Sequence, residues 1–223
     1  MRAMNLIYCL LLLATSVAFN SVQASDTSSA AQGTTISPPR GLVSVAKSPA
    51  ATASFSNAAS NHALRFVDAY LALSDINKIE KGERPEKRHY AVVLQPTDDK
   101  LRFASPDTFA ALVGDMRKSF FGPAEIWHAN AYMKAKGEDS KLVDTNGDRI
   151  LVDETNCFAI VTRGRYEIDG NSKLPPMSLG VAYIRIRGQL FVVKIFAKGD
   201  VPEEAEWLTN EIPVWLRSLV VRN

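Results

Sequence analysis

Residues 179–198 decide the fold of this chain, and they read LGVAYIRIRGQLFVVKIFAK. Two apolar runs flank the pair Gly188-Gln189, and glycine at the first central position is typical of a type II′ turn between antiparallel strands. Counting pairs outward from that turn sets Ile184 opposite Val193. The sequence therefore predicts a long β-hairpin centred on this turn.

The two faces of the predicted hairpin differ in chemistry, because successive side chains of a strand point to opposite sides. One face is wholly apolar and carries Ala182, Ile184, Ile186, Phe191, Val193 and Ile195. The other face is mixed and carries Tyr183, Arg185, Arg187 and Lys194 beside Val181, Val192 and Phe196. We expect the first face to lie on the core and the mixed face to look outward or into a groove.

Two amphipathic helices are expected, one earlier in the chain than most of the strands and one at the C-terminal end. The first begins at Ser105-Pro106, carries apolar residues at helical spacing and ends at Gly122-Pro123. The second begins near Pro202 and buries a stripe that ends at Leu219. Proline disfavours helical geometry in the residue before it, so Pro213 predicts a kink or break in the second helix.

Two further segments are predicted to be helical. Residues 62–81 carry a broad apolar face in their first three turns, and Gly82 follows as a stop signal. Residues 124–136 are ambiguous: their Ala and Lys content favours a helix, whereas Ile126-Trp127 would suit a strand.

The remaining strands are predicted from short apolar runs and from one turn. Residues 89–95 form an apolar run closed by Pro96, and residues 157–162 have the character of a central strand. The pair Asn146-Gly147 predicts a second hairpin, because both central positions of a type I′ turn need positive φ. The predicted class is α+β, a mainly antiparallel sheet with amphipathic helices packed on one face.

The predicted domain organisation has three parts. Residues 1–24 resemble a secretory signal peptide, with Arg2 before an apolar run and small residues ahead of a cut after Ala24. The alternative is a retained membrane anchor. Residues 25–61 are rich in Ser, Ala and Thr and predict a disordered arm, which leaves residues 62–223 as a single α+β domain.

Charge and cysteine content narrow the classes of function. The whole chain has 26 Lys and Arg against 24 Asp and Glu, a balance that gives no reason to expect nucleic-acid binding. Cleavage after Ala24 would remove Cys9 and leave Cys157 as the single thiol, so no intramolecular disulfide is expected. The signal peptide predicts a periplasmic or secreted protein with no membrane span after cleavage.

Few residues have the pattern of a catalytic or metal site. His62, His89 and His128 are the histidines, and none stands at metal-ligand spacing from another ligand. Any of them could be a general base if an acidic partner lay within reach. Cys157 lies in an apolar strand and is expected to be buried and inert.

A calcium-like pattern occurs at Asp144, Asn146, Asp148 and Asp153. An EF-hand loop needs a glycine after its third ligand and a glutamate later, and Arg149 and Thr155 stand there instead. We prefer the hairpin interpretation and predict no metal site. No motif for a cofactor or a nucleophile elbow is present in the sequence, so we predict no cofactor.

The sequence favours a non-catalytic binding or accessory protein. Its candidate binding residues are Tyr183, Arg185, Arg187 and Lys194, which would place an aromatic ring among cations on one sheet face. Such a face suits an acidic protein or a small anionic ligand. The simpler interpretation is a solvated face whose long side chains cover apolar neighbours. The alternative function is a small hydrolase that uses His89 or His128 with an acidic partner.

Overall fold

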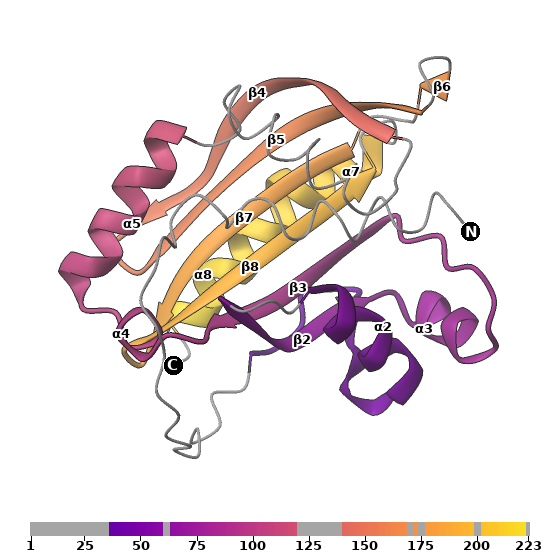
Figure 1. Ribbon diagram of the computed structural model, residues 1–223, viewed down its shortest axis with the longest axis horizontal. Helices are drawn as coiled ribbons and strands as arrows, with labels where there is room; N and C mark the ends of the chain where they lie inside the picture. The colour runs from indigo at the N-terminus through magenta and orange to yellow at the C-terminus, as the bar shows by residue number, and fades with distance from the viewer. Residues whose placement is uncertain are drawn as a thin grey trace.

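The computed structural model describes residues 36–59, 63–119, 140–168, 172–173, 177–198 and 202–221 (Figure 1). These residues form an antiparallel sheet with helices on both of its faces, so the predicted α+β class and mainly antiparallel sheet are confirmed. The strands follow one another across the sheet in the order β1 (Val43–Ser44), β2 (Leu64–Leu71), β3 (His89–Pro96), β8 (Gln189–Lys198), β7 (Met177–Ile186), β5 (Cys157–Ile168) and β4 (Ser140–Glu154). The short strand β6 (Ser172–Lys173) also pairs with β5.

The predicted hairpin is formed by β7 and β8, but its turn lies one residue earlier than expected. Arg187 and Gly188 occupy the turn with φ of 50° and 77°, and Ile186 pairs with Gln189. Two successive positive φ angles give a type I′ turn, whose twist matches that of the flanking strands. Each residue of β7 therefore pairs with the β8 residue two positions before the predicted partner. A shift of two residues leaves every side chain on its predicted face.

The two faces of the sheet are both buried in packed cores, which corrects the expectation that the mixed face looks outward or into a groove. We call them the α8 face and the α2 face. On the α8 face, Ile184 and Phe191 belong to one core with residues of the C-terminal helix α8 (Ile212–Val221). On the α2 face, Val181 and Val192 belong to a second core that includes helix residues. Figure 1 shows the C-terminal helix behind the sheet and α2 on the other side.

The helices on the α2 face are α2 (Pro49–Ala59) and α5 (Pro106–Ser119). The sequence prediction placed helices on one face because it read the mixed face as exposed. That face carries enough apolar side chains to hold a second layer, and Phe55 of α2 and Phe109 of α5 supply the covering groups. Helix α5 confirms the predicted start of this helix, whereas the end predicted at Gly122-Pro123 lies outside the described residues. The Ser105 hydroxyl caps the start of α5 and accepts from the Thr108 N–H at 3.1 Å.

Residues 36–59 are part of the fold, which corrects the disordered arm predicted for residues 25–61 over this range. A 3₁₀ turn (Val45–Lys47) precedes α2, and the side chains of Val45, Ala51 and Phe55 are fully buried. Alanine favours helix, and Ala51 and Phe55, four residues apart, lie on one side of α2, where both are buried. Residues 25–35 and 60–61 lie outside the described residues.

The same N-terminal stretch reaches the opposite layer through two hydrogen bonds. The hydroxyl of Tyr70 donates to the carbonyl of Ile36 at 2.5 Å, and the indole N–H of Trp215 donates to the carbonyl of Ser37 at 2.7 Å. Ile36 and Leu42 belong to the core of the α8 face, whereas Val45 belongs to that of the α2 face. Residues 36–45 therefore pass from one layer to the other.

The helix predicted over residues 62–81 is wrong in its first half. The chain forms β2 and then, after Ala72, helix α3 (Leu73–Glu80). The apolar spacing suits a helix, but a one-residue bulge between Phe66 and Asp68 shifts the alternation of the strand and leaves Val67 38% exposed. Gly82 ends α3 as predicted, with φ of 72°.

The hairpin predicted at Asn146-Gly147 is also wrong. Strand β4 runs through both residues, and the chain reverses at Thr155-Asn156, where Glu154 pairs with Cys157. Between Asn146 and Arg149, β4 advances three residues while β5 advances two. The extra residue forms a bulge, so Asn146-Gly147 bends the strand instead of reversing it.

A kink or a break was predicted near Pro213, and the C-terminal helix does not break there. The chain passes from α7 (Pro202–Glu206) through a π-helical turn (Trp207–Glu211) directly into α8. The N–H of Ile212 bonds to the carbonyl of Trp207, five residues earlier. The wider turn accommodates the proline that follows without ending the helix.

Three further findings concern residues 124–136, a possible membrane span and the segment between β3 and α5. Residues 124–136, for which a helix was favoured, lie outside the described residues. In the described part of the chain, no helix is both long and apolar enough to cross a membrane. A short helix, α4 (Asp99–Arg102), joins β3 to α5 and was not expected from the sequence.

Candidate functional site

Lys194 lies near the centre of the sheet, on the α2 face of β8. Its residue is 1% exposed, and its Nζ has no hydrogen-bond partner among the described residues. Its cross-strand neighbours are Val92 on β3 and Val181 on β7, both of them buried and apolar. Burial lowers the pKa of Lys194 from 10.5 to about 7, because the charged ammonium loses its hydration and gains no partner.

A second buried polar atom without a partner lies on the same face. The hydroxyl oxygen of Thr162 on β5 has no hydrogen-bond partner in the described part of the chain, and the residue is 1% exposed. Thr162 pairs with Leu179 of β7, which in turn pairs with Phe196 of β8, two residues from Lys194. We call Lys194 and Thr162 the interior polar pair. Their strands are separated by β7, so the two backbones lie about 10 Å apart.

The four residues predicted to form a cationic and aromatic face are not brought together on an exposed surface. Tyr183 is 4% exposed, and burial, with a smaller contribution from the charge of Asp115, raises the pKa of its hydroxyl to about 12. Lys194 lies on the same covered face, as described above. The predicted face is therefore interior, because the α2 layer covers it.

Arg185 and Arg187, the two arginines of the predicted face, lie near the turn of the hairpin and have different environments. The Arg185 Nε donates to the carbonyl of Ala104 at 2.7 Å, and its Nη1 donates to Oδ1 of Asn156 at 3.3 Å. Arg185 thus fastens the start of α5 and the β4–β5 turn to β7. Arg187 is exposed in the turn between β7 and β8.

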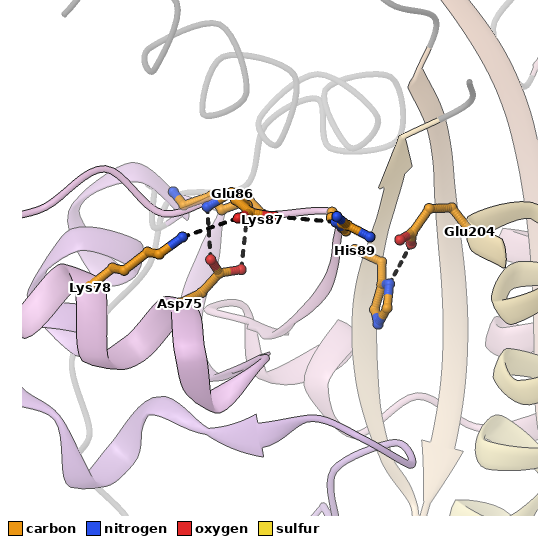
Figure 2. Close-up of polar contacts among 7 residues, drawn as sticks. Asp75, Lys78, Glu86, Lys87, His89 and Glu204 are labelled. Carbon is orange, nitrogen blue, oxygen red and sulfur yellow. Dashed lines mark hydrogen bonds and ion pairs between the residues drawn. The ribbon is translucent and has the colours of Figure 1, made fainter. Parts of the chain in front are cut away.

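His89 is paired with a buried carboxylate, as Figure 2 shows. It is the first residue of β3, and its Nδ1 is in hydrogen-bond contact with Oε2 of Glu204 on α7. The side chains are 25% and 4% exposed, respectively. The His89 ring also stacks on Trp207, with 4.3 Å between centroids and 24° between planes. Glu204 and Trp207 therefore fix the orientation of the imidazole.

The loop that leads into His89 is held by a second buried carboxylate. Asp75 of α3, which is 4% exposed, accepts from the backbone N–H of Glu86 at 2.8 Å and of Lys87 at 3.0 Å (Figure 2). The Lys78 Nζ forms an ion pair with Glu86 at 3.1 Å. The contacts with Lys78 and, to a smaller extent, Arg88 lower the pKa of Glu86. These contacts hold the loop and so fix the position of His89 at the start of β3.

The sequence suggested His89 with an acidic partner but could not identify Glu204. The two residues are 115 positions apart, and no local spacing connects them. Among the described residues, no serine, threonine or cysteine shares a hydrogen bond with His89. His62 and His128, the other two histidines, lie outside the described residues.

Cys157 is fully buried, which confirms the prediction. Burial, and to a smaller extent the charge of Glu154, raises its thiol pKa to about 12, so the nucleophilic thiolate is scarce at neutral pH. In the described ranges, no group of three or more His, Cys, Asp or Glu side chains could hold a metal ion. Asp153, from the calcium-like pattern, instead pairs with Arg117 of α5.

The site residues thus come from β3, β5, β8 and α7, which are far apart in the chain. Two sites emerge from the geometry: the interior polar pair on the α2 face and the His89–Glu204 pair on the α8 side. The first could bind an anion, and the second could accept a proton. No family model matches this sequence, and no curated protein matches it either.

Proposed function

We propose that this protein is an exported, non-catalytic binding protein that takes up a small anionic ligand at Lys194. The observation that supports the proposal is that the Lys194 amine is buried and has no hydrogen-bond partner among the described residues. An ammonium group in an apolar interior loses several kcal/mol of solvation unless a counter-charge lies beside it. A ligand anion would supply that counter-charge.

Stability alone does not account for a lysine at this position. A methionine of similar length could fill the same space between Val92 and Val181 without desolvating an amine. Lys194 therefore destabilises the empty protein, and a function that needs a cation would compensate for the loss. The proposal that the protein is exported rests on the signal-like residues 1–24, and it makes the periplasm or the exterior the source of the ligand.

The test uses an anionic aromatic dye, 1-anilinonaphthalene-8-sulfonate, titrated into the protein at pH 7 while its fluorescence is recorded. We expect saturable binding to the wild-type protein and at least tenfold weaker binding to Lys194→Met. The matched control is Lys100→Met, which removes a charge from an exposed position and should bind as the wild type does. Equal affinity of all three proteins, with circular dichroism showing each to be folded, would overturn the proposal.

A second candidate function is hydrolysis with His89 as a general base. The observation that favours it is the contact of His89 with the buried Glu204, which orients the imidazole in the way that a catalytic carboxylate does. A water molecule would have to be the nucleophile. The test is the hydrolysis of p-nitrophenyl acetate by the wild type and by His89→Gln. Activity that is lost in the variant would favour this function, and equal rates would exclude it.

A further inference from the structure

We infer that the ligand taken up at Lys194 is an amphiphile with a single negative charge and a hydrocarbon body, such as a long-chain carboxylate. This inference rests on the proposed function and narrows its ligand class. It follows from two features of the α2 face: the chemistry of the side chains around the amine and the number of cations available to a ligand.

The side chains around Lys194 are apolar on every side that the register defines. Val92 and Val181 lie opposite it on the neighbouring strands, and Val192 and Phe196 flank it along β8 on the same face. All four are at most 3% exposed. A sugar or a peptide would lose hydrogen bonds to water in such surroundings, whereas a hydrocarbon chain would lose none.

The cations near this part of the α2 face are otherwise engaged. Arg185 donates to Ala104 and Asn156, and the Lys87 Nζ lies over the ring of Phe55, 4.8 Å from its centroid. Within the part of the chain that the structure describes, Lys194 thus offers one positive charge to a ligand. A monoanion balances that charge, whereas a dianion would leave one buried negative charge without a partner.

Thr162 supplies the second polar atom of the interior polar pair. Its hydroxyl lies on the same face and lacks a partner in the described part of the chain, so it can donate a hydrogen bond to an acceptor brought in by the ligand. Thr162→Val removes that donor and keeps the shape of the side chain. We expect this variant to bind the ligand two- to tenfold more weakly than the wild type.

The experiment is isothermal titration calorimetry of the full mature chain with four probes at concentrations below micelle formation: dodecanoate, dodecanol, dodecyl phosphate and acetate. We expect dodecanoate to bind most tightly. In Lys194→Met, dodecanoate binding should weaken at least tenfold while dodecanol binding stays unchanged, because only the head group meets the amine. Lys100→Met should match the wild type with every probe.

The protonation of the Lys194 amine on binding gives a second test of the inference. Above pH 7, part of the Lys194 amine is unprotonated, so a carboxylate that pairs with it must draw a proton from the buffer. At pH 8.5 the binding enthalpy of dodecanoate should therefore change with the ionisation enthalpy of the buffer, and it should not do so in Lys194→Met. Dodecanol should show no such dependence in either protein.

The outcomes separate the inference from the function on which it rests. Acetate that binds as tightly as dodecanoate, and only when Lys194 is present, would support an anion-binding function and overturn the amphiphile. If dodecyl phosphate bound more tightly than dodecanoate, the inference that the ligand carries a single negative charge would be wrong. The absence of any Lys194-dependent binding, with both proteins folded, would overturn the inference and the proposed function together.

Discussion

Lys194 makes the stability of the protein depend on pH in a direction that can be worked out. Its pKa falls from 10.5 to about 7 on folding, so between these values the unfolded chain binds more protons than the folded one. Stability therefore rises as pH increases from about 7 toward 10.5, and it is lowest below pH 7, where the buried amine must be charged. Most proteins with ordinary lysines show no such rise in this range.

We expect the free energy of unfolding of the wild type to increase between pH 7 and 8.5 with a slope that approaches about 1.4 kcal/mol per pH unit. Lys194→Met should remove this slope and be more stable at pH 7, because it has no amine to desolvate. Urea denaturation at several pH values measures both effects, with Lys100→Met as the control. An unchanged slope in Lys194→Met would mean that the amine is not the titrating group.

The upper limit of that pH range is set by tyrosine and cysteine side chains whose pKa is raised by burial, which among the described residues are Tyr70, Cys157 and Tyr183. Burial raises the pKa of Cys157 and of Tyr183 to about 12, above the ordinary 9.0 and 10.0. For these acids the unfolded chain releases protons first, so their contribution to stability is complete below pH 9 and is lost as pH rises toward 12. Measurements below pH 8.5 therefore isolate Lys194.

Single residues differ in how far their sequence context predicts their environment. The burial of Cys157 could be predicted, because the four residues that follow it in the strand, Phe158 to Val161, are apolar. The burial of Lys194 could not: alternation assigns a side chain to one face of a strand but does not say whether another layer covers that face. The partnership of His89 with Glu204 was equally hidden, since tertiary packing alone brings β3 and α7 together.

At the scale of elements, two glycines in opposite backbone conformations allow a matched comparison. Gly188 has φ of 77° in the β7–β8 turn, and Gly114 lies within α5; a Cβ added at either would meet no atom within 4 Å. Gly188→Ala should destabilise the protein by about 1 kcal/mol, because the left-handed region disfavours a side chain. Gly114→Ala should stabilise it by about 0.5–1 kcal/mol through helix propensity.

Thermal denaturation measures this pair of variants, and a difference of about 1 kcal/mol corresponds to about 2–4 °C in Tm for a chain of this size. Since the substitution is the same at both sites and neither creates a clash, opposite shifts would report backbone conformation alone. Shifts of the same sign would contradict the assigned turn.

Elements that sit next to strong local signals could be predicted, and those that depend on a partner strand could not. Pro106 and the capping Ser105 mark the start of α5, and two apolar runs around a glycine mark the hairpin. By contrast, residues 64–71 have a spacing that fits both helix and strand, and pairing with β3 decides between them. Asn146-Gly147 would make a turn in isolation, but pairing with β5 continues on both sides of it, so the strand bulges there and does not reverse.

At the scale of the whole molecule, the sheet needs both of its layers. Phe55 and Val45 are fully buried on the α2 face, and both lie in a stretch whose composition is typical of disorder. Composition alone does not predict that such a segment is ordered, because it gives the number of apolar residues and not their positions in the fold. Removing the segment would expose the α2 face, including Tyr90, whose ring meets that of Phe55 with 5.6 Å between centroids.

We therefore expect a chain that begins at residue 60 to be much less stable than one that begins at residue 36. The loss should exceed that of Phe55→Ala in the longer chain, which we expect to be about 3–5 kcal/mol. Thermal denaturation of the three proteins measures the order of stabilities. Equal Tm values for the two chain lengths would show that residues 36–59 do not contribute to the core.

The two hydrogen bonds that tie Ile36 and Ser37 to Tyr70 and Trp215 also impose an order of events on the newborn polypeptide. Residue 36 is synthesised before residue 215, so the hydrogen bond between Ser37 and Trp215 cannot form until α8 has been made. The contact of residues 36–37 with the layer of α8 is therefore completed only after α8 is present.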